Sequence, residues 1–277
     1  MITGTGSTPA QQFPVKTFVN ENALAEALEK SPELIGSIDN GTSSTRFLVF
    51  TPLGKIAASA QVEYPQIFPA GEAKSGWHEH DPLEVWESVV TCVNAVVEAL
   101  ESKDITFKDR PLAAVGITNQ RETTIAWNAE TGVPYYNAIV WDDMRTMNIA
   151  EELASGDKDR FRDKTGLPLS TYFAGTKVKW LVEHVPQLRE DLNDQYAAEH
   201  VRFGTVDSWL LYQLTGQKSP SKDAANFKGS FATDVTNASR WLFMNIHTTQ
   251  WDKEIIDEIC APFDIPISTL PRIWPSR

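Results

Sequence analysis

The chain has 277 residues, 42% hydrophobic and 22% charged, with a formal net charge of −12, and this length and composition are typical of a soluble globular protein with its own core. The acidic balance argues against binding to nucleic acid or an anionic membrane through a basic surface, although a few local donors can still hold a phosphate. Two cysteines, Cys92 and Cys260, are too few for a disulfide-stapled fold and lack metal-ligand spacing, so we expect a reducing, cytoplasmic setting.

Residues 1–33 are predicted to be a flexible tail that contains one short helical segment over residues 21–30. The first 14 residues are polar and lack both the basic region and the apolar run of a secretory signal. Apolar runs elsewhere stop far short of the roughly 20 residues that cross a bilayer. We therefore expect no membrane span.

From Leu34 onwards the pattern becomes that of consecutive strands. Three strands are predicted, over residues 34–39, 46–50 and 55–64. Polar turns separate them, and the second turn has Pro52 and Gly54 at favoured positions. In the third strand alternation places four apolar residues on one face, namely Ile56, Ala58, Ala60 and Val62. This pattern predicts an antiparallel meander.

A long amphipathic helix is predicted after the meander. Asp81 can cap its N-terminus, Pro82 fits the first helical position, and apolar residues at helical spacing continue to Leu100. Further strands are predicted over residues 112–118, 123–127 and 138–141, and further helices over 144–154, 175–184 and 205–214. This order predicts a mixed α/β sheet flanked by helices, without the strict alternation of a dinucleotide-binding fold.

The first candidate site is the polar segment Asp39–Arg46, with the sequence DNGTSSTR, between two predicted strands. A carboxylate at a strand end can hold Mg²⁺ through water. The following glycine and small hydroxyl residues offer N–H and O–H donors to phosphate oxygens, and Arg46 adds a charge-assisted partner. The alternative is a polar β-turn that Asp39 caps.

The second candidate site is the segment Thr118–Thr123, with the sequence TNQRET, between two apolar strands. Arg121 and Glu122 could hold a polyol, with Glu122 accepting from hydroxyl groups and Arg121 donating. The alternative is a surface ion pair of little energetic value. Trp141 and Tyr172 could supply an apolar wall and a phenolic donor, although such residues more often belong to the core.

Familiar nucleotide and metal motifs are absent from the sequence. It contains no Gly-x-x-x-x-Gly-Lys-Ser/Thr, no Gly-x-Gly-x-x-Gly after a strand and no His-Glu-x-x-His. Two histidines flank an acid in the segment His78–His80, but three neighbouring residues cannot close a metal site by themselves.

The order and spacing of several motifs resemble the glycerol kinases of the FGGY carbohydrate kinase family. The motifs are DNGTSSTR from Asp39, GITNQRETT from Gly116, NAIVW from Asn137, YFAGTK from Tyr172, GTVDSW from Gly204, TNASR from Thr236 and NIHT from Asn245. The resemblance covers the chain from about residue 34 to its end. Within the family, the NQRET loop distinguishes the kinases that act on glycerol from those that act on other sugars.

The resemblance implies an α/β, actin-like or ribonuclease H-like ATPase domain. It implies transfer of the γ-phosphoryl group of ATP to glycerol, which gives sn-glycerol 3-phosphate. Phosphate contacts are implied at Thr42, Ser43, Ser44 and Arg46, and a Mg²⁺ contact is implied at Asp39. Glycerol contacts are implied at Arg121, Glu122, Trp141 and Tyr172.

The sequence departs from the family pattern in two places. Asn40 stands where the family often has Gln, and the Gly-Asp-Gln segment that carries the catalytic Asp of the family is absent. Residues 34–277 are therefore expected to be the glycerol-binding N-terminal domain without its C-terminal partner, inactive alone and prone to form homo-oligomers through exposed apolar surface. Two alternatives stay open: a kinase for another polyol or sugar, and a non-catalytic actin-like interaction module.

Overall fold

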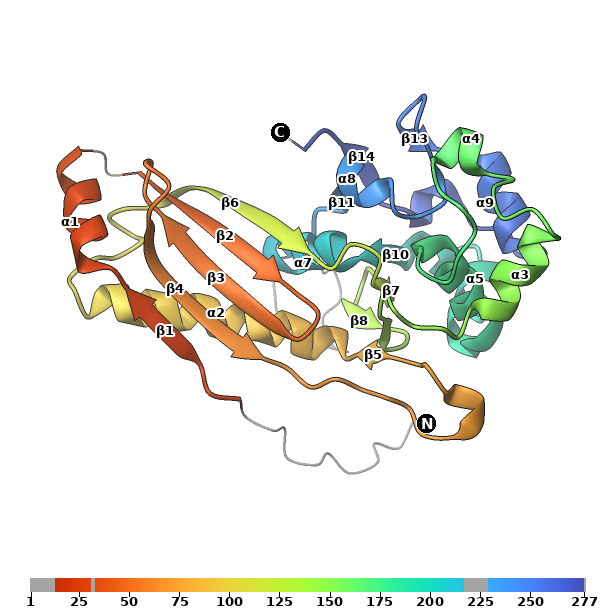
Figure 1. Cartoon of the computed structure of the whole chain (residues 1–277), viewed down its shortest axis with the longest axis horizontal. Helices are drawn as coiled ribbons and strands as arrows, with labels where there is room; N and C mark the ends of the chain where they lie inside the picture. The colour runs from red at the N-terminus through yellow and green to blue at the C-terminus, as the bar shows by residue number, and fades with distance from the viewer. Residues whose placement is uncertain (1–12, 31–32, 217–228, 277) are drawn as a thin grey trace. The chain divides into compact units, whose positions relative to one another are not determined.

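The computed structural model describes residues 13–30, 33–216 and 229–276. The chain divides into two compact units, which are considered separately (Figure 1). Unit 1 takes its described residues from the ranges Met1–Pro65 and Glu87–Thr118, and unit 2 takes its own from Gln66–Trp86 and Asn119–Arg277. No helix in the described ranges has the length and apolar character needed to cross a membrane.

Unit 1 is built on a sheet with the described strand order β1-β4-β3-β2-β6. Its strands are β1 (Lys16–Val19), β2 (Leu34–Asn40), β3 (Ser44–Phe50), β4 (Ile56–Glu63) and β6 (Leu112–Asn119). Strands β2, β3 and β4 pair antiparallel in sequence order, which confirms the predicted meander (Figure 1). The predicted strand over residues 112–118 is also confirmed, as β6.

The first described residues of unit 1 form a strand and a helix, whereas the sequence analysis predicts a tail with one short helix. Helix α1 (Glu21–Lys30) confirms the predicted helical segment, and it buries Ala23 and Leu24. Strand β1 pairs antiparallel with β4, and Phe18 lies opposite Ser59. The sequence of β1 does not predict this pairing, because a four-residue strand with an exposed phenylalanine lacks a clear apolar face.

One detail of the predicted alternation in β4 is wrong. Ala58, Ala60 and Val62 are buried as expected, but Ile56 is 38% exposed. The register shifts at this point, because Val49 lies opposite Ala58 whereas Phe50 lies opposite Ile56. Strand β4 therefore has one extra residue, Ala57, at this point, and such a bulge turns the side chains beyond it to the other face.

Helix α2 (Pro82–Glu101) confirms the predicted long helix and begins where the sequence places its cap. Oδ1 of Asp81 accepts a hydrogen bond from the backbone N–H of Leu83 at 2.8 Å. The helix contributes its first turn to unit 2 and the rest to unit 1. Its buried face in unit 1 includes Val89, Cys92, Val96 and Leu100.

Unit 2 contains a small sheet with the order β10-β7-β9-β5, to which β8 adds by pairing with β7. Its strands are β5 (Glu79–His80), β7 (Thr124–Asn128), β8 (Val133–Pro134), β9 (Ala138–Ile139) and β10 (Val201–Thr205). Two further strand pairs are β11 (Ala232–Asp234) with β14 (Arg272–Trp274), and β12 (Met244–Asn245) with β13 (Gln250–Trp251). Strands β7 and β9 confirm two predicted strands, although β9 is shorter than expected.

The described residues of unit 2 also form a series of helices. They are α3 (Met147–Ala154), α4 (Arg162–Thr165), α5 (Ala174–His184), α6 (Pro186–Asn193), α7 (Val206–Thr215), α8 (Val235–Ala238) and α9 (Lys253–Cys260). Short 3₁₀ turns are η1 (Glu72–Lys74), η2 (Ala197–His200) and η3 (Ile267–Thr269). Helices α3, α5 and α7 confirm the three predicted helices, with bounds that differ by up to three residues.

The N-terminus of α5 is held against the segment that follows α8. The backbone N–H of Gly175 donates to the carbonyl of Trp241 at 2.8 Å, and that of Ala174 donates to the carbonyl of Arg240 at 3.3 Å. A Cβ atom on Gly175 would lie 2.6 Å from the oxygen of Trp241, so this close approach requires glycine. The contact brings Arg240 to the residues that precede α5.

Candidate functional site

The candidate phosphate segment is the turn that joins β2 to β3 in unit 1. The N–H of Gly41 donates to the carbonyl of Ser44 at 3.0 Å, and Asp39 lies opposite Arg46 across the strand pair. Because successive side chains of a strand alternate between faces, the segment divides into two sets. Asp39, Ser44 and Arg46 lie on the accessible face, whereas Asn40 and Thr45 are completely buried.

Of the residues predicted to contact nucleotide phosphates, Ser44 and Arg46 belong to the accessible set, and Thr42 and Ser43 lie in the turn itself. Ser43 is exposed and the side chain of Arg46 is 52% exposed, with its Nε 3.7 Å from Oδ2 of Asp39. Oγ of Ser44 accepts a hydrogen bond from Gln61 at 3.3 Å. The structure thus brings Thr42, Ser43, Ser44, Arg46 and Asp39 together at one turn.

The buried set holds this turn in place. Nδ2 of Asn40 donates to Oγ1 of Thr45 at 2.7 Å, and the hydroxyls of Thr45 and Ser88 are 2.6 Å apart. The hydroxyl of Tyr64 donates to the carbonyl of Gly41. The sequence analysis treats the hydroxyl residues after Gly41 as one row of phosphate donors and does not predict that the side chain of Thr45 is buried. Strand alternation from the buried Phe47 could have indicated this.

The donor set at this turn fits Mg²⁺ as a ligand shared with a phosphate. Mg²⁺ keeps several waters and is commonly held by one or two carboxylates together with substrate phosphates. Asp39 supplies one partly exposed carboxylate beside the hydroxyl row. Within the described ranges there is no group of three or more His, Cys, Asp or Glu side chains that could hold a metal by itself.

The candidate polyol residues lie in unit 2, where β6 leads into β7. Glu122 is buried, and its Oε1 accepts a hydrogen bond from Nε of Arg240 at 2.6 Å. Arg121 is exposed and donates to the carbonyl of Thr236 at 3.4 Å. Glu122 is therefore a buried carboxylate paired with a distant, partly exposed arginine, in place of the surface pair with Arg121 that the sequence leaves open.

Two aromatic residues lie next to this ion pair. The rings of Trp141 and Tyr172 are 5.5 Å apart at an angle of 60°, and both residues are partly buried. The guanidinium of Arg240 lies over the ring of Tyr172 at 5.6 Å. The structure thus brings Glu122, Trp141 and Tyr172 together, and it adds Arg240, whose role the sequence does not indicate.

Lys177 is a second residue to which the sequence assigns no role. Its side chain is fully buried, and its Nζ donates to the carbonyls of Thr171 and Tyr172 at 2.9 and 2.7 Å. Burial lowers the pKa of Lys177 to about 7, against the opposing effects of Asp143 and Glu122. Lys177 shares the buried face of α5 with Ala174, Val178 and Leu181, so its position in that apolar row could have revealed it.

Comparison with known proteins shows which family combines these features. Residues 34–277 match the N-terminal domain of the FGGY family of carbohydrate kinases. The chain belongs to this family. The matched range includes both candidate sites, and its start at residue 34 coincides with the start of β2.

Among relatives, a glycerol kinase of Clavibacter michiganensis subsp. michiganensis is 46% identical over 244 residues, which is 88% of this chain and 43% of that protein. The crystal structure of Plasmodium falciparum glycerol kinase with ADP is 32% identical, with a TM-score of 0.68 over 87% of this chain and 43% of that one. A gluconate kinase from Lactobacillus acidophilus is 21% identical with a TM-score of 0.64 over 87% of this chain and 42% of that one, which shows the fold alone.

The chain spans less than half the length of these relatives. The predicted fold class, an α/β domain of the actin-like and ribonuclease H-like type, is confirmed by the structural neighbours and by the mixed sheets with flanking helices.

Proposed function

We propose that this FGGY family chain is the glycerol-binding part of an ATP-dependent glycerol kinase, and that residues 34–277 form its N-terminal domain. The whole enzyme would transfer the γ-phosphoryl group of ATP to glycerol and form sn-glycerol 3-phosphate. The observation that carries the proposal is the ion pair of the buried Glu122 with the partly exposed Arg240, beside Trp141 and Tyr172. It supplies an oriented carboxylate next to aromatic rings, in a chain 46% identical to a glycerol kinase.

The chemistry of this cluster suits a small polyol. Glycerol presents three hydroxyl groups around a short carbon chain, so its site needs charged hydrogen-bond partners and one apolar wall. Glu122 can accept from hydroxyl groups, and Arg121 can donate to them. The ring of Trp141 can cover the carbon edge, and Tyr172 can contribute its phenolic hydroxyl.

The turn between β2 and β3 would serve the nucleotide. Phosphoryl transfer depends mainly on positioning and on neutralising the charge of the phosphates. Thr42, Ser43 and Ser44 offer small donors to phosphate oxygens, and Arg46 offers a positive charge. Mg²⁺ held through Asp39 would supply further neutralisation of phosphate charge.

The general base lies outside these residues in our proposal. The family resemblance places that base in a Gly-Asp-Gln segment, and the 277 residues contain no such tripeptide. Residues 1–277 are therefore proposed to bind glycerol without turning it over.

A reducing cytoplasmic setting also belongs to the proposal. Cys92 and Cys260 are both free and buried. Burial raises the pKa of Cys92 to about 11 and that of Cys260 to about 12, so both remain thiols at neutral pH. Two unpaired, protected thiols suit a compartment in which disulfides do not form.

Calorimetric titration of the chain with glycerol, xylulose and gluconate tests the substrate. We expect heat of binding with glycerol alone, and we expect Glu122→Gln to weaken it while Glu130→Gln, at an exposed turn position, does not. Preferential binding of xylulose or gluconate would instead support another kinase of the family. The same three compounds can be tested with the longest protein that the gene encodes. If that protein binds none of them and releases no ADP from ATP in their presence, a non-catalytic module is favoured.

A further inference from the structure

Lys177 places a positive charge at a point where the helix and the core gain nothing from it. It ends the first turn of α5, which begins at Ala174, and its side chain is fully buried. Removal of an ammonium group from water is costly, and its charge also opposes the positive end of the helix dipole. Helix formation and apolar packing therefore do not account for a lysine here, and its polar partners must offset the cost.

The partners of Lys177 are the two carbonyls on either side of one Cα atom. Its Nζ donates to the carbonyls of Thr171 and Tyr172 at 2.9 and 2.7 Å. These carbonyls belong to the two peptide groups that flank the Cα atom of Tyr172, and each peptide group is planar. Fixing both planes fixes the backbone dihedrals of Tyr172, and with them the direction in which its side chain leaves the chain.

The side chain of Tyr172 points along that direction into the aromatic part of the candidate glycerol site. Its ring lies 5.5 Å from that of Trp141 and 5.4 Å from that of Phe173. The guanidinium of Arg240, which pairs with Glu122, lies over the same ring at 5.6 Å. The backbone of Tyr172 thus determines where its phenol lies relative to the candidate glycerol carboxylate.

The charged groups that act on Lys177 come from other segments of unit 2. Burial lowers the pKa of Lys177 to about 7, and Arg145 acts in the same direction. Asp143, Glu122 and Asp142 oppose the shift. Asp143 and Glu122 are buried, whereas the side chain of Asp142 is 42% exposed.

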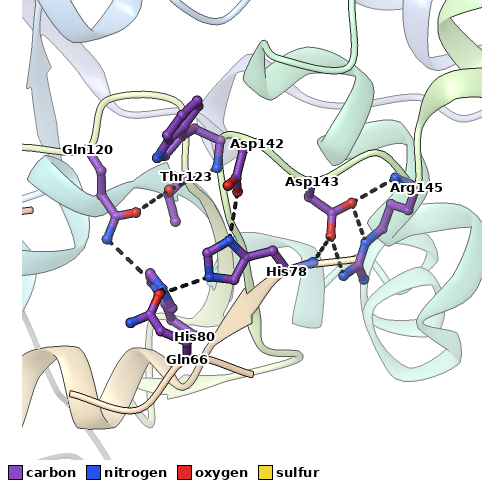
Figure 2. Close-up of polar contacts among 9 residues, drawn as sticks. Gln66, His78, His80, Gln120, Thr123, Asp142, Asp143 and Arg145 are labelled. Atoms are coloured by element: carbon purple, nitrogen blue, oxygen red, sulfur yellow. Dashed lines mark hydrogen bonds and ion pairs between the residues drawn. The ribbon is translucent and has the colours of Figure 1, made fainter. Parts of the chain in front are cut away.

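The buried carboxylates near Lys177 have too few guanidinium partners to balance their charge. Nε and Nη2 of Arg145 donate to the two oxygens of Asp143 at 2.9 and 2.8 Å (Figure 2). The same Nη2 lies 2.8 Å from Oε1 of Glu79, so Arg145 serves two carboxylates at once. Together with the pair made by Glu122, two guanidinium groups serve three buried carboxylates. Lys177 supplies a third positive charge, which favours its protonated form.

We propose that Lys177 is a positioning residue, which holds Tyr172 in the candidate glycerol site through the carbonyls of Thr171 and Tyr172. The effect on glycerol rests on the proposed function, whereas the hold on the backbone does not. Loss of the lysine proton leaves two N–H donors without the charge, and a charge-assisted hydrogen bond is roughly twice as strong as a neutral one. Deprotonation should therefore loosen Tyr172 and weaken glycerol binding, and by linkage bound glycerol should raise the pKa of Lys177.

Calorimetry with glycerol tests the effect on binding in the 277-residue chain. Wild-type Kd should rise on the order of two- to tenfold from about pH 6 to 8, as Lys177 loses its proton. Lys177→Met keeps an unbranched apolar side chain but removes every N–H donor. Its Kd should exceed the wild-type value on the order of tenfold at about pH 6, and should not vary over this range.

Lys179→Met is the matched control for this measurement. Lys179 lies on the same helix and donates to a different carbonyl, that of Ala261, at 3.0 Å. This variant should keep the wild-type Kd and its pH profile. A folded Lys177→Met protein with the affinity or the pH profile of the wild type would overturn the proposal, and so would an equal loss in Lys179→Met.

NMR of the wild-type chain without glycerol provides a test that needs no variant. The carbonyl-carbon signals of Thr171 and Tyr172 are followed from about pH 6 to the pH at which the Cε signal of Lys177 shows loss of its proton. We expect the three signals to change with one midpoint, near pH 7. Constant carbonyl signals through the deprotonation of Lys177 would overturn the proposal. If the wild type binds glycerol at no pH, the proposed function fails, and this titration still decides whether Lys177 holds Tyr172.

Discussion

Arg240 donates its Nε–H to Oε1 of Glu122 over 2.6 Å, although 118 positions separate the two residues in the sequence. The side chain of Glu122 is 5% exposed and that of Arg240 is 24% exposed. Arg240 also covers the rings of Tyr172 and Phe173. One guanidinium thus fixes the orientation of the carboxylate and packs against the neighbouring aromatic residues.

We expect Arg240→Lys to weaken glycerol binding by about 1–3 kcal/mol, because lysine keeps the charge but loses the planar donor group that fits both the carboxylate and the rings. Calorimetry on Glu122→Gln, Arg240→Lys and the double variant should show coupling of about 1 kcal/mol or more in binding. The exposed pair Lys164–Glu254 provides the control, since its removal should leave glycerol affinity unchanged. Additive effects of the Glu122 and Arg240 substitutions would contradict the shared role.

Arg46→Gln should weaken nucleotide binding and leave glycerol binding intact. A charge-assisted hydrogen bond to phosphate contributes about 1.5–3 kcal/mol, so ADP affinity should fall by roughly ten- to a hundredfold, measured by titration at low and high salt. Lys16→Gln changes the charge equally at another exposed position and is the matched control. An unchanged affinity for ADP would show that the turn between β2 and β3 is a structural hairpin.

The sequence predicts those parts of the fold that depend on neighbours along the chain. The meander, the capped start of α2 and the polar turn after Asp39 follow from alternation, helical spacing and turn residues. The bulge opposite Val49 does not follow, because it depends on how two strands pair. Local pattern therefore indicates the elements but not the register between them.

The same distinction applies to the candidate sites. Motif residues such as Glu122 can be identified from sequence, but their partners come from distant segments, as Arg240 does. The segment His78–His80 suggests a weak metal pattern, whereas the structure directs both rings to Gln66. Only the folded chain shows that these histidines share a hydrogen-bond acceptor.

Thr45→Val should destabilise unit 1 without removing any accessible donor from the turn. Valine has nearly the same shape, but it removes the hydroxyl that accepts a hydrogen bond from the buried Nδ2 of Asn40. The expected loss is about 1–3 kcal/mol in the free energy of unfolding, measured with urea. Ser43→Ala, at the exposed position of the same turn, should change it by less than about 0.5 kcal/mol. Equal effects of the two substitutions would contradict the inward role of Thr45.

Asp207 should lower the free energy of unfolding as the pH rises, whereas an ion-paired carboxylate raises it. Burial raises the pKa of Asp207 to about 6, although Thr205 and Thr233 donate hydrogen bonds that oppose the shift. Between about pH 4 and 6 the folded state therefore binds a proton that the unfolded state releases. The contribution of this group to stability is present at low pH and is lost as the pH rises through that window.

Asp207→Asn removes this titration while keeping the shape of the side chain. The free energy of unfolding of the wild type, minus that of the variant, should fall by about 2 kcal/mol between pH 4 and 7, because the folded pKa lies about two units above the unfolded one. Urea unfolding at several pH values measures the difference directly. Because the other titrating groups are the same in both proteins, their contributions cancel in this difference. The control Asp159→Asn, at an exposed position, should give a difference in unfolding free energy that does not change in this way with pH. A difference that stays constant with pH, or that rises, would mean that the Asp207 carboxyl is charged throughout the range in the folded chain.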